Sequence, residues 1–324
     1  GDNNPLILSL IRAADKGKQV VCIVELKARF DEQRNIYWAQ KMEKAGIHVV
    51  YGVVGFKTHC KTTLVLRREG KNIVAYGHVG SGNYNNVTAR SYTDVGLFTA
   101  SKKITSELVQ LFHLLTGRSF KRKFNHLLVA PVNMKERFLE LIQREIHFAE
   151  NGKSARIVIK CNSLDDKEII EKLYEASQAS VHVDLIIRGF CTLRPDIAGL
   201  SDHIRVISII GQFLEHSRIF YFQNGKQKTI DGDFFIGSAD WMHRNLHGRL
   251  EVVAPIEDRK IKRRCWEILS TTLSDQRRAW EMDSKGKYTQ RDAKIEGGEG
   301  AEEISSQERL KQLTNLRAEF TPIE

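Results

Sequence analysis

Two histidines, each followed two positions later by a cation, are the residues best suited to chemistry: His59 with Lys61, and His216 with Arg218. On a β-strand, residues two apart lie on one face, so each imidazole is expected beside its positive charge. An imidazole can attack phosphorus or carry a proton, while a fixed cation neutralises charge on phosphate oxygens. The two motifs therefore indicate phosphate chemistry.

Each motif is followed by a loop of small residues at the same distance. The loops are residues 80–83 (GSGN) and 237–240 (GSAD), and each ends 24 positions after its histidine. Small side chains would let backbone N–H groups approach an anion, to which Asn83 can also donate. One such motif carries little information, but two copies with identical spacing favour a duplicated domain.

An offset of 157 residues relates the two motifs. Ahead of them, Arg29 and Arg188 follow corresponding predicted strands, 30 and 28 positions before the respective histidines. The same offset maps the predicted strand 155–161 onto the very start of the chain. We therefore expect the first repeat to lack its opening strand.

Hydrophobic periodicity predicts the elements that must position these residues. In the first half we expect helices over residues 3–17, 31–45 and 104–116, with Asp31 as an N-cap, and strands over 20–25, 47–51, 62–67, 73–78 and 93–99. In the second half we expect helices over 134–151, 165–179 and up to 269, and strands over 155–161, 181–187, 204–210, 219–223, 229–236 and 251–255. Such alternation is typical of an α/β fold with mostly parallel sheets flanked by helices.

The length of 324 residues fits two domains. We place them at residues 1–130 and 131–282, followed by a polar, solvated tail over 283–324 in which residues 305–317 could form a short helix. The net charge of +10 suits a polyanionic partner or simply favours solubility. No apolar run approaches the roughly 20 residues that span a bilayer. Five scattered cysteines without a CxxC pair favour a reducing cytoplasm.

The paired motifs resemble the phospholipase D superfamily, in which two such motifs meet at one site and one histidine becomes phosphorylated. The sequence departs from that pattern in three ways. Arg218 stands where lysine is usual, Asp240 stands where asparagine is usual, and the customary aspartate shortly after each HxK is absent. These departures count against an ordinary phospholipase D.

A more specific resemblance is to the histidine-dependent polyphosphate kinases. It rests on residues 24–32, 55–61, 78–85, 89–94, 214–218 and 238–242. It extends from residue 2 to about 282 and implies two tandem phospholipase-D-like domains, each a mixed, mostly parallel sheet flanked by helices. The resemblance also leads us to expect the family's amino-terminal helical domain and head domain outside this chain.

The resemblance implies roles for the matching residues. His59 resembles the nucleophile that takes the γ-phosphoryl group of ATP, and His216 resembles its partner in proton transfer and phosphate binding. Lys61 and Arg218 are the accompanying cations, and His78 resembles a residue that orients the phosphate loop.

Other matching positions concern the nucleotide and the metal. Tyr92 and Arg188 resemble contacts to nucleotide phosphates, with Asn83 beside them. Arg29 resembles a position associated with Mg²⁺, where a guanidinium, having no free lone pair, would clamp phosphate rather than ligate the ion. His243 and His247 match no motif and are expected to be ordinary surface or core histidines.

The resemblance implies Mg²⁺-dependent, reversible transfer between ATP or ADP and inorganic polyphosphate. It also implies a homo-oligomer for the full-length protein, no nucleic-acid partner and a cytoplasmic location, leaving peripheral association with the membrane open. We expect the chain by itself to be poorly active with ATP. Two alternatives remain: a phosphodiesterase or phosphatidyltransferase of phospholipase D type, and a non-catalytic module that binds polyanions.

Overall fold

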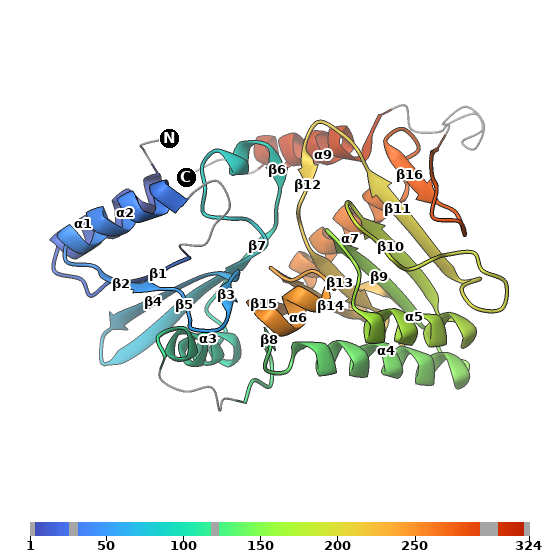
Figure 1. The fold of residues 1–324 in the computed structure, drawn as a ribbon, viewed down its shortest axis with the longest axis horizontal. Coiled ribbons are helices and arrows are strands. Elements are labelled where there is room, and N and C mark those ends of the chain that lie inside the picture. The colour runs from blue at the N-terminus through green and yellow to red at the C-terminus, as the bar shows by residue number, and fades with distance from the viewer. Residues whose placement is uncertain (1–3, 26–31, 118–122, 292–303, 321–324) are drawn as a thin grey trace.

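The computed structural model describes residues 4–25, 32–117, 123–291 and 304–320, and its architecture is mixed α/β. Figure 1 shows two parts side by side, with a large sheet in the second part and smaller sheets in the first. The α/β class predicted from the sequence is therefore confirmed. The expectation of mostly parallel sheets is wrong for the described strands, because hairpins and short returns make most of their pairings antiparallel. Within the described ranges, every helix is too short or too polar to cross a membrane.

The elements of the first part follow the predicted order closely. They are α1 (Pro5–Asp15), β1 (Val21–Val24), α2 (Glu32–Lys44), β2 (His48–Tyr51), β3 (Lys57–Thr58), β4 (Lys61–Glu69), β5 (Asn72–Gly80), the 3₁₀ turn η1 (Thr88–Arg90), β6 (Tyr92–Thr93), β7 (Gly96–Thr99) and α3 (Lys102–Leu115).

The second part contains the remaining elements. They are β8 (Leu128–Ala130), α4 (Met134–Glu150), β9 (Arg156–Cys161), α5 (Lys167–Gln178), β10 (His182–Ile187), β11 (Ile204–Ile209), β12 (Leu214–Glu215), β13 (Ile219–Phe222), the 3₁₀ turn η2 (Thr229–Asp231), β14 (Asp233–Gly237), α6 (His243–Gly248), β15 (Arg249–Ile256), α7 (Arg259–Leu273), β16 (Ala279–Met282), β17 (Tyr288–Gln290) and α9 (Ser306–Phe320).

The large sheet joins the two parts. Among the described residues, its strands run in the order β17–β16–β11–β10–β9–β13–β14–β15–β3, with β8 also paired to β15. β9, β10 and β11 are parallel, whereas β13, β14 and β15 are antiparallel neighbours. β3 comes from the first part, and a second junction is the parallel pair of β6 with β12. These two pairings fix the parts relative to each other.

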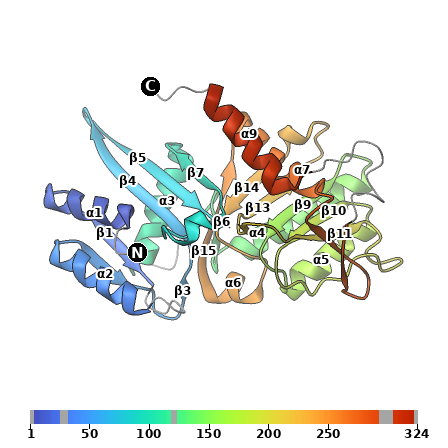
Figure 2. The same cartoon turned by 90° about the horizontal axis from the view of Figure 1, so that it is seen from above.

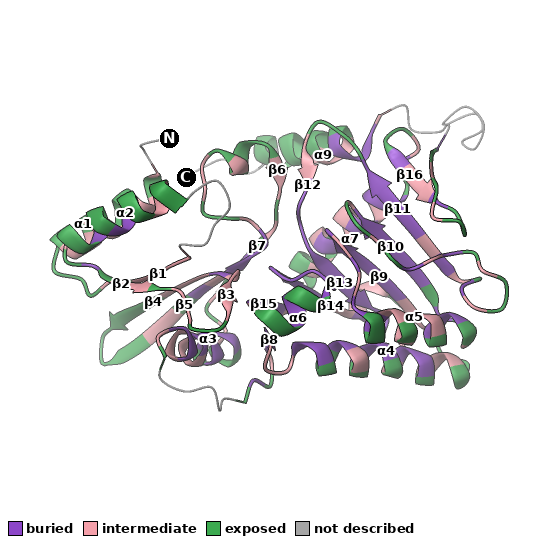
Figure 3. Cartoon of the chain, in the orientation of Figure 1, coloured by how far each residue is buried: buried purple, intermediate pink, exposed green. Residues whose placement is uncertain are grey.

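The first part contains a parallel pair, β1 with β2, and an antiparallel sheet of β4, β5 and β7. β4 and β5 form the hairpin that the sequence predicts, and strands joined by so short a turn must be antiparallel. α3 packs on one face of this sheet, where a Cβ on Gly77 would lie only 2.3 Å from Leu108 Cδ1. Apolar side chains such as Val65, Tyr76 and Phe98 are exposed. Figure 3 shows the outer ends of β4 and β5 in the colour of exposed residues.

The second part has a core on each face of its sheet. Along β9, Ile157 and Ile159 belong to the core that contains α4 and α5, while Val158 belongs to a core that contains α7. Both faces are apolar because helices cover both, as is usual for parallel strands. The second core also contains Leu108 of α3, so apolar packing continues across the junction.

Side-chain caps set the starts of three helices. Asn4, Asp166 and Asp258 each accept a hydrogen bond from a backbone N–H in the first turn of α1, α5 and α7. Those N–H groups have no partner inside the helix, so a cap stabilises the end. Asp31, predicted to cap α2, lies outside the described residues.

Two strand predictions are corrected by the structure. The strand expected over residues 93–99 is divided into β6 and β7, because Asp94 turns out of the ladder toward His216. The strand expected over 229–236 begins only at Asp233, and residues 229–231 form η2. Gly232 follows that turn, where a Cβ would lie 2.6 Å from Phe222 O, so the chain makes a close approach before it enters β14.

The expectation of a solvated tail over 283–324 is wrong for its described parts. β17 pairs with β16, and α9 lies along α7 (Figure 2). The start of α9 is held by polar contacts: Ser306 N donates to Asp275 Oδ2 over 2.7 Å, and the Gln307 amide donates to Phe213 O over 2.8 Å. The expected short helix is therefore present, and residues 292–303 lie outside the described part of the chain.

The tight packing of the 237–240 loop gives a first prediction. A Cβ on Gly237 would lie 2.2 Å from Val252 O and 2.6 Å from Val253 Cα, both backbone atoms that cannot turn aside. Gly237→Ala should therefore lower the free energy of unfolding by about 2 kcal/mol or more, measured from urea unfolding curves. Gly248→Ala is the matched control, since no atom lies within 4 Å of its ideal Cβ. Equal losses in the two variants would contradict this packing.

Candidate active site

The two histidine motifs lie where the first and second parts meet. His59 follows β3, and its backbone N–H donates to Leu250 O of β15 over 3.0 Å. His216 follows β12, and its N–H donates to Thr93 O of β6 over 3.1 Å. Each histidine is therefore held by a strand of the opposite part, which brings residues far apart in sequence to one junction.

A buried carboxylate orients the His59 imidazole. Nδ1 of His59 lies 2.7 Å from Oε1 of Glu251, whose side chain is fully buried. The Asn245 amide donates to the same oxygen over 2.7 Å, and the Ser238 hydroxyl donates to Oε2. Because an ionised carboxylate only accepts hydrogen bonds, the neutral ring of His59 carries its proton on Nδ1 and has a free lone pair on Nε2.

The second motif repeats this arrangement with the parts exchanged. Nδ1 of His216 lies 2.8 Å from Oδ1 of Asp94, and the Ser81 hydroxyl donates to that oxygen over 2.6 Å. The offset of 157 that relates the motifs also relates Asp94 to Glu251 and Ser81 to Ser238. Each half thus supplies the carboxylate for the other half's histidine.

Sequence reasoning missed both carboxylates. The expected aspartate shortly after each HxK is absent. Asp94 lies 35 positions after His59, and Glu251 lies 35 positions after His216. The signal that could have found them is the offset itself, which places an acid at matching positions of both repeats. Nothing local to either acid distinguishes it from an ordinary strand residue.

Burial and neighbouring charge make His59 a neutral base. Burial is the largest influence on the pKa of His59 and lowers it, Glu251 opposes that effect, and the charges of Lys61 and Arg218 lower it further. Burial alone would raise the pKa of Glu251, but His59 and Lys61 lower it on balance. The pair at neutral pH is therefore an ionised carboxylate and a neutral imidazole.

His216 has the same character. Burial is again the main cause that lowers its pKa, and Arg218 adds to the effect while Asp94 opposes it. The pKa of Asp94 is lowered despite burial, because His216 and the Ser81 hydroxyl favour the ionised form. Two neutral imidazoles, each held at Nδ1, therefore occupy the junction.

Two buried cations lie beside the histidines. Lys61 is 5% exposed and donates to the backbone oxygen of His59, and burial is the main cause that lowers its pKa to about 8. Arg218 is 1% exposed and donates to Asp240 over 3.2 and 3.3 Å. Arg218 also donates to Ser81 O over 3.3 Å, which brings it across to the first part.

Three further side chains extend this cluster. The Arg188 guanidinium donates to Glu215 O over 3.1 Å, and burial is the main cause that lowers its pKa. The Tyr92 ring lies 5.0 Å from that of His216, centroid to centroid. Arg249, which sequence reasoning missed, has a pKa lowered mainly by burial, with the charges of Glu251, Asp240 and Arg218 nearby. No local pattern marks Arg249, which begins an ordinary strand.

His78 and Asn83 make different contacts. His78 Nδ1 lies 2.7 Å from the Tyr84 hydroxyl, and its ring centroid lies 4.7 Å from that of Phe98. It lines a pocket of about 450 Å³ whose wall also includes Asp94, so the pocket borders the histidine junction. Asn83 is exposed at the end of its loop.

The small-residue loops were expected to offer backbone N–H groups to an anion, but their two serine N–H groups are already engaged. Ser81 N donates to Val95 O over 2.9 Å, and Ser238 N donates to Val252 O over 3.0 Å, so neither is free for an anion. The glycines instead permit close packing, since a Cβ on Gly82 would lie 2.7 Å from the Asp94 carboxylate. The loops therefore position the serine hydroxyls that support the carboxylates.

Three carboxylates of the site are not available to a resident Mg²⁺ ion. Arg29, predicted near the metal, lies outside them. Of the nearby acids, Glu251 and Asp94 are engaged by histidines and Asp240 by Arg218. Mg²⁺ needs oxygen ligands, commonly carboxylates together with substrate phosphates and water. These three carboxylates are therefore already engaged, so an ion that enters with nucleotide phosphates fits better.

The histidine–carboxylate pairing predicts a measurable pKa change. Glu251→Gln removes the negative charge that opposes the effect of burial, so the pKa of His59 should fall further. A ¹⁵N NMR titration of the imidazoles measures this. Asp94→Asn is the matched control, which should lower the pKa of His216 and leave that of His59 nearly unchanged. An unaltered His59 titration in Glu251→Gln would contradict the pairing.

Comparison with known proteins places the chain in a family. The family models described as Polyphosphate kinase C-terminal domain 1 and domain 2 match residues 1–121 and 127–307. The polyphosphate kinases of Thermosynechococcus vestitus and Synechocystis sp. are 54% and 53% identical over 289 residues, which is 89% of this chain and 39% of theirs. The chain thus spans about two fifths of the length of these curated relatives.

A solved structure agrees over nearly the whole chain. The crystal structure of polyphosphate kinase from Porphyromonas gingivalis matches with a TM-score of 0.88 and 37% identity, covering 99% of this chain and 48% of that one. The family models account for the duplicated motifs, one in each matched domain. The chain therefore belongs to the polyphosphate kinase family and carries the two carboxy-terminal domains of that family.

Proposed function

We propose that this protein transfers the γ-phosphoryl group of ATP reversibly to the end of inorganic polyphosphate, through a phosphohistidine at His59. The observation that carries the proposal is the state of His59: a neutral imidazole, held at Nδ1 by buried Glu251 and accompanied by the buried Lys61. Membership of a family whose matched relatives are named polyphosphate kinases supports the same reaction.

The chemistry has two steps. In the first, the Nε2 lone pair of His59 forms a bond to the γ-phosphorus while the bond from phosphorus to the bridging oxygen breaks, and ADP leaves with that electron pair. In the second, a terminal oxygen of polyphosphate attacks the same phosphorus, and the electron pair of the P–N bond returns to Nε2. Glu251 accepts the Nδ1–H bond throughout and stabilises the positive charge that the ring gains.

The surrounding groups act on charge and position. Lys61, Arg188 and Arg218 are placed to stabilise charge on the phosphate oxygens, which supplies most of the rate in phosphoryl transfer. His216 is a neutral imidazole held at Nδ1 by Asp94, so its Nε2 lone pair is placed to take a proton from the oxygen that attacks and to return it to the oxygen that leaves. Mg²⁺ enters this proposal as part of the nucleotide substrate.

The wider proposal follows the family resemblance. We infer a homo-oligomer for the full-length protein, a cytoplasmic location, no nucleic-acid partner, and a division of the chain near residue 130. The net charge of +10 supports a long polyanionic acceptor.

Labelled polyphosphate tests the covalent step. We would incubate the full-length protein with labelled polyphosphate and Mg²⁺, quench in alkali, and measure protein-bound label that is stable in alkali and lost in acid. The wild type should retain such label, since phosphohistidine has this stability. His59→Ala should abolish it, whereas His216→Ala should slow its appearance because the nucleophile remains.

The outcomes separate the proposal from its alternatives. Label that survives in His59→Ala would mean that another residue is the nucleophile. Salt-sensitive binding without any label would favour a polyanion-binding module. Cleavage of a phosphodiester without ATP would favour the phospholipase D type of reaction.

The low pKa of Lys61 predicts an alkaline limit to activity. Above pH 8 the free enzyme should lose the Lys61 charge, so kcat/KM should fall with an apparent pKa of about 8. Lys61→Arg should move this limb upward by about one pH unit or more, because a guanidinium stays protonated. Lys172→Arg, on the outer helix α5, is the control and should leave the limb in place. If Lys61→Arg leaves the alkaline pKa of kcat/KM unchanged, the loss of activity arises from the ionisation of another group.

A further inference from the structure

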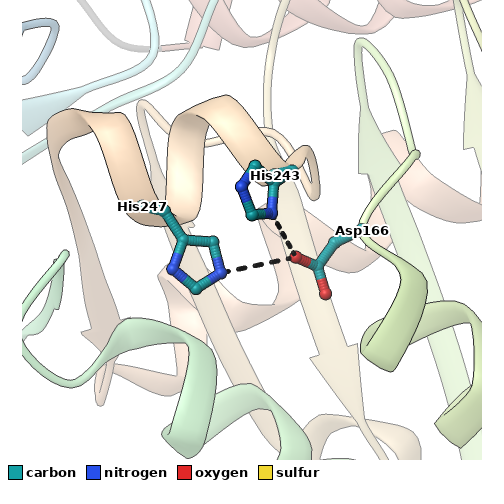
Figure 4. A group of neighbouring side chains, drawn as sticks. All are labelled: Asp166, His243 and His247. Carbon is teal, nitrogen blue, oxygen red and sulfur yellow. Dashed lines mark ion pairs between the residues drawn. The ribbon is translucent and has the colours of Figure 1, made fainter.

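A second cluster of ligating side chains lies between the start of α5 and the short helix α6. Figure 4 shows the rings of His243 and His247 turned toward the carboxylate of Asp166. His243 Nδ1 lies 3.9 Å and His247 Nε2 lies 3.7 Å from Asp166 Oδ2. One potential ligand atom from each residue lies within 4.8 Å of the others. The phosphoryl transfer proposed above uses none of these residues.

The fold presets this geometry. Residues four apart lie on one face of a helix, and the ring centroids of His243 and His247 are 4.4 Å apart with an interplanar angle of 31°. The His243 N–H donates to Asp165 Oδ1 over 2.7 Å, which fixes the start of α6. Asp166 is 1% exposed and caps α5 through Oδ1, which accepts from Ile169 N. Its other oxygen, Oδ2, is therefore the one that approaches the histidines.

Lys135 of α4 is the competing partner of this cluster. Its ammonium lies 3.2 Å from His247 Nε2, 3.4 Å from Asp166 Oδ1 and 2.6 Å from Glu168 Oε1. The contact with His247 indicates that Nε2 is presented as an acceptor, with the lone pair that a metal would take. Because the shortest contact is to Glu168, the ammonium keeps an anionic partner when it moves away from His247.

We propose that Asp166, His243 and His247 bind a divalent transition-metal ion such as Zn²⁺. Two imidazole nitrogens and one carboxylate oxygen are a typical ligand set of an open Zn²⁺ site, in which water takes the remaining position. Imidazole ligands also favour Zn²⁺, Co²⁺ and Ni²⁺ over the hard ion Mg²⁺. The side chains of His243 and His247 are 75% and 44% exposed, so an ion can reach them from solvent.

A bound ion would connect two loops that meet at the candidate active site. The loop after β9 contains Asn162, whose N–H donates to Asp240 Oδ1 over 2.8 Å, and it ends at Asp166. Asp166 N donates to Trp241 O over 3.2 Å, and His243 follows two residues later. The ion would therefore hold residues 240–243 against the loop that ends at Asp166. Metal binding would stabilise this segment, which carries Asp240.

Metal titration of the full-length protein, without nucleotide or polyphosphate because both chelate metals, tests the proposal. We expect one Co²⁺ per chain with the visible absorption of a low-coordinate ion, displaced by Zn²⁺. We also expect a Zn²⁺-dependent rise in melting temperature, because an ion that binds only the native state stabilises it.

Variants of the ligands should remove both signals. His243→Ala and His247→Ala should each abolish stoichiometric binding, and these exposed residues can be changed with little risk to folding. Asp166→Asn should do the same while preserving the cap of α5, since asparagine also caps helices. Lys135→Met should tighten binding at least severalfold, because it removes the competing ammonium, whereas a purely structural cluster would gain nothing.

Two controls locate the ion. His182 and His203 form another histidine pair, with ring centroids 5.3 Å apart, and among the described residues no third ligand completes a site there. His182→Ala and the active-site variant His59→Ala should both retain stoichiometric Co²⁺. Binding that survives in His243→Ala and His247→Ala, or that disappears in either control, would place the metal elsewhere and overturn the proposal. Absence of Co²⁺ and Zn²⁺ binding at micromolar concentrations in the wild type would do so as well.

Discussion

The structure depends on an exchange of carboxylates between its two parts. Glu251 of the second part holds His59, and Asp94 of the first part holds His216. Glu251 is fully buried and Asp94 is partly exposed; a buried carboxylate is costly unless it is paired and hydrogen-bonded. Separation of the parts would leave Glu251 and Asp94 without their histidines. Each half is therefore electrostatically incomplete alone, and the junction that satisfies these charges is also the junction that assembles the candidate active site.

Backbone hydrogen bonds position His59 relative to its carboxylate partner. Leu250 O accepts hydrogen bonds from the N–H groups of both His59 and Cys60, and Glu251 is the next residue along the same strand. The histidine and its carboxylate are thus placed by one short stretch of β15, with little dependence on side-chain flexibility. The apolar core that runs from α3 to α7 supports the junction from behind. Packing, strand pairing and charge all favour the same arrangement of the two parts.

The sequence predicted what is local or repeated. The element order, the hairpin of β4 and β5 and the paired motifs depend on short-range patterns, and these agree with the structure. The carboxylate partners could not be read in the same way, because Glu251 lies inside an apolar strand and its histidine lies 192 residues away. The anchoring of α9 was missed for a similar reason: Gln307 bonds Phe213 and Glu215 through polar contacts that no hydrophobic period reveals. Arg29 lies outside the described residues, so its predicted role stays a prediction.

Duplication does not make the two histidines equivalent. Arg218 donates to Asp240 through two nitrogens, so its charge is largely compensated within its own half. The position that corresponds to Asp240 in the first half is Asn83, which is neutral and exposed. Among the described residues, Lys61 therefore has no such dedicated carboxylate, and it shares the influence of Glu251 with His59. One carboxylate, Glu251, therefore accompanies His59 and Lys61, whereas two, Asp94 and Asp240, accompany His216 and Arg218. Negative phosphate oxygens are repelled less beside His59, which supports His59 rather than His216 as the nucleophile.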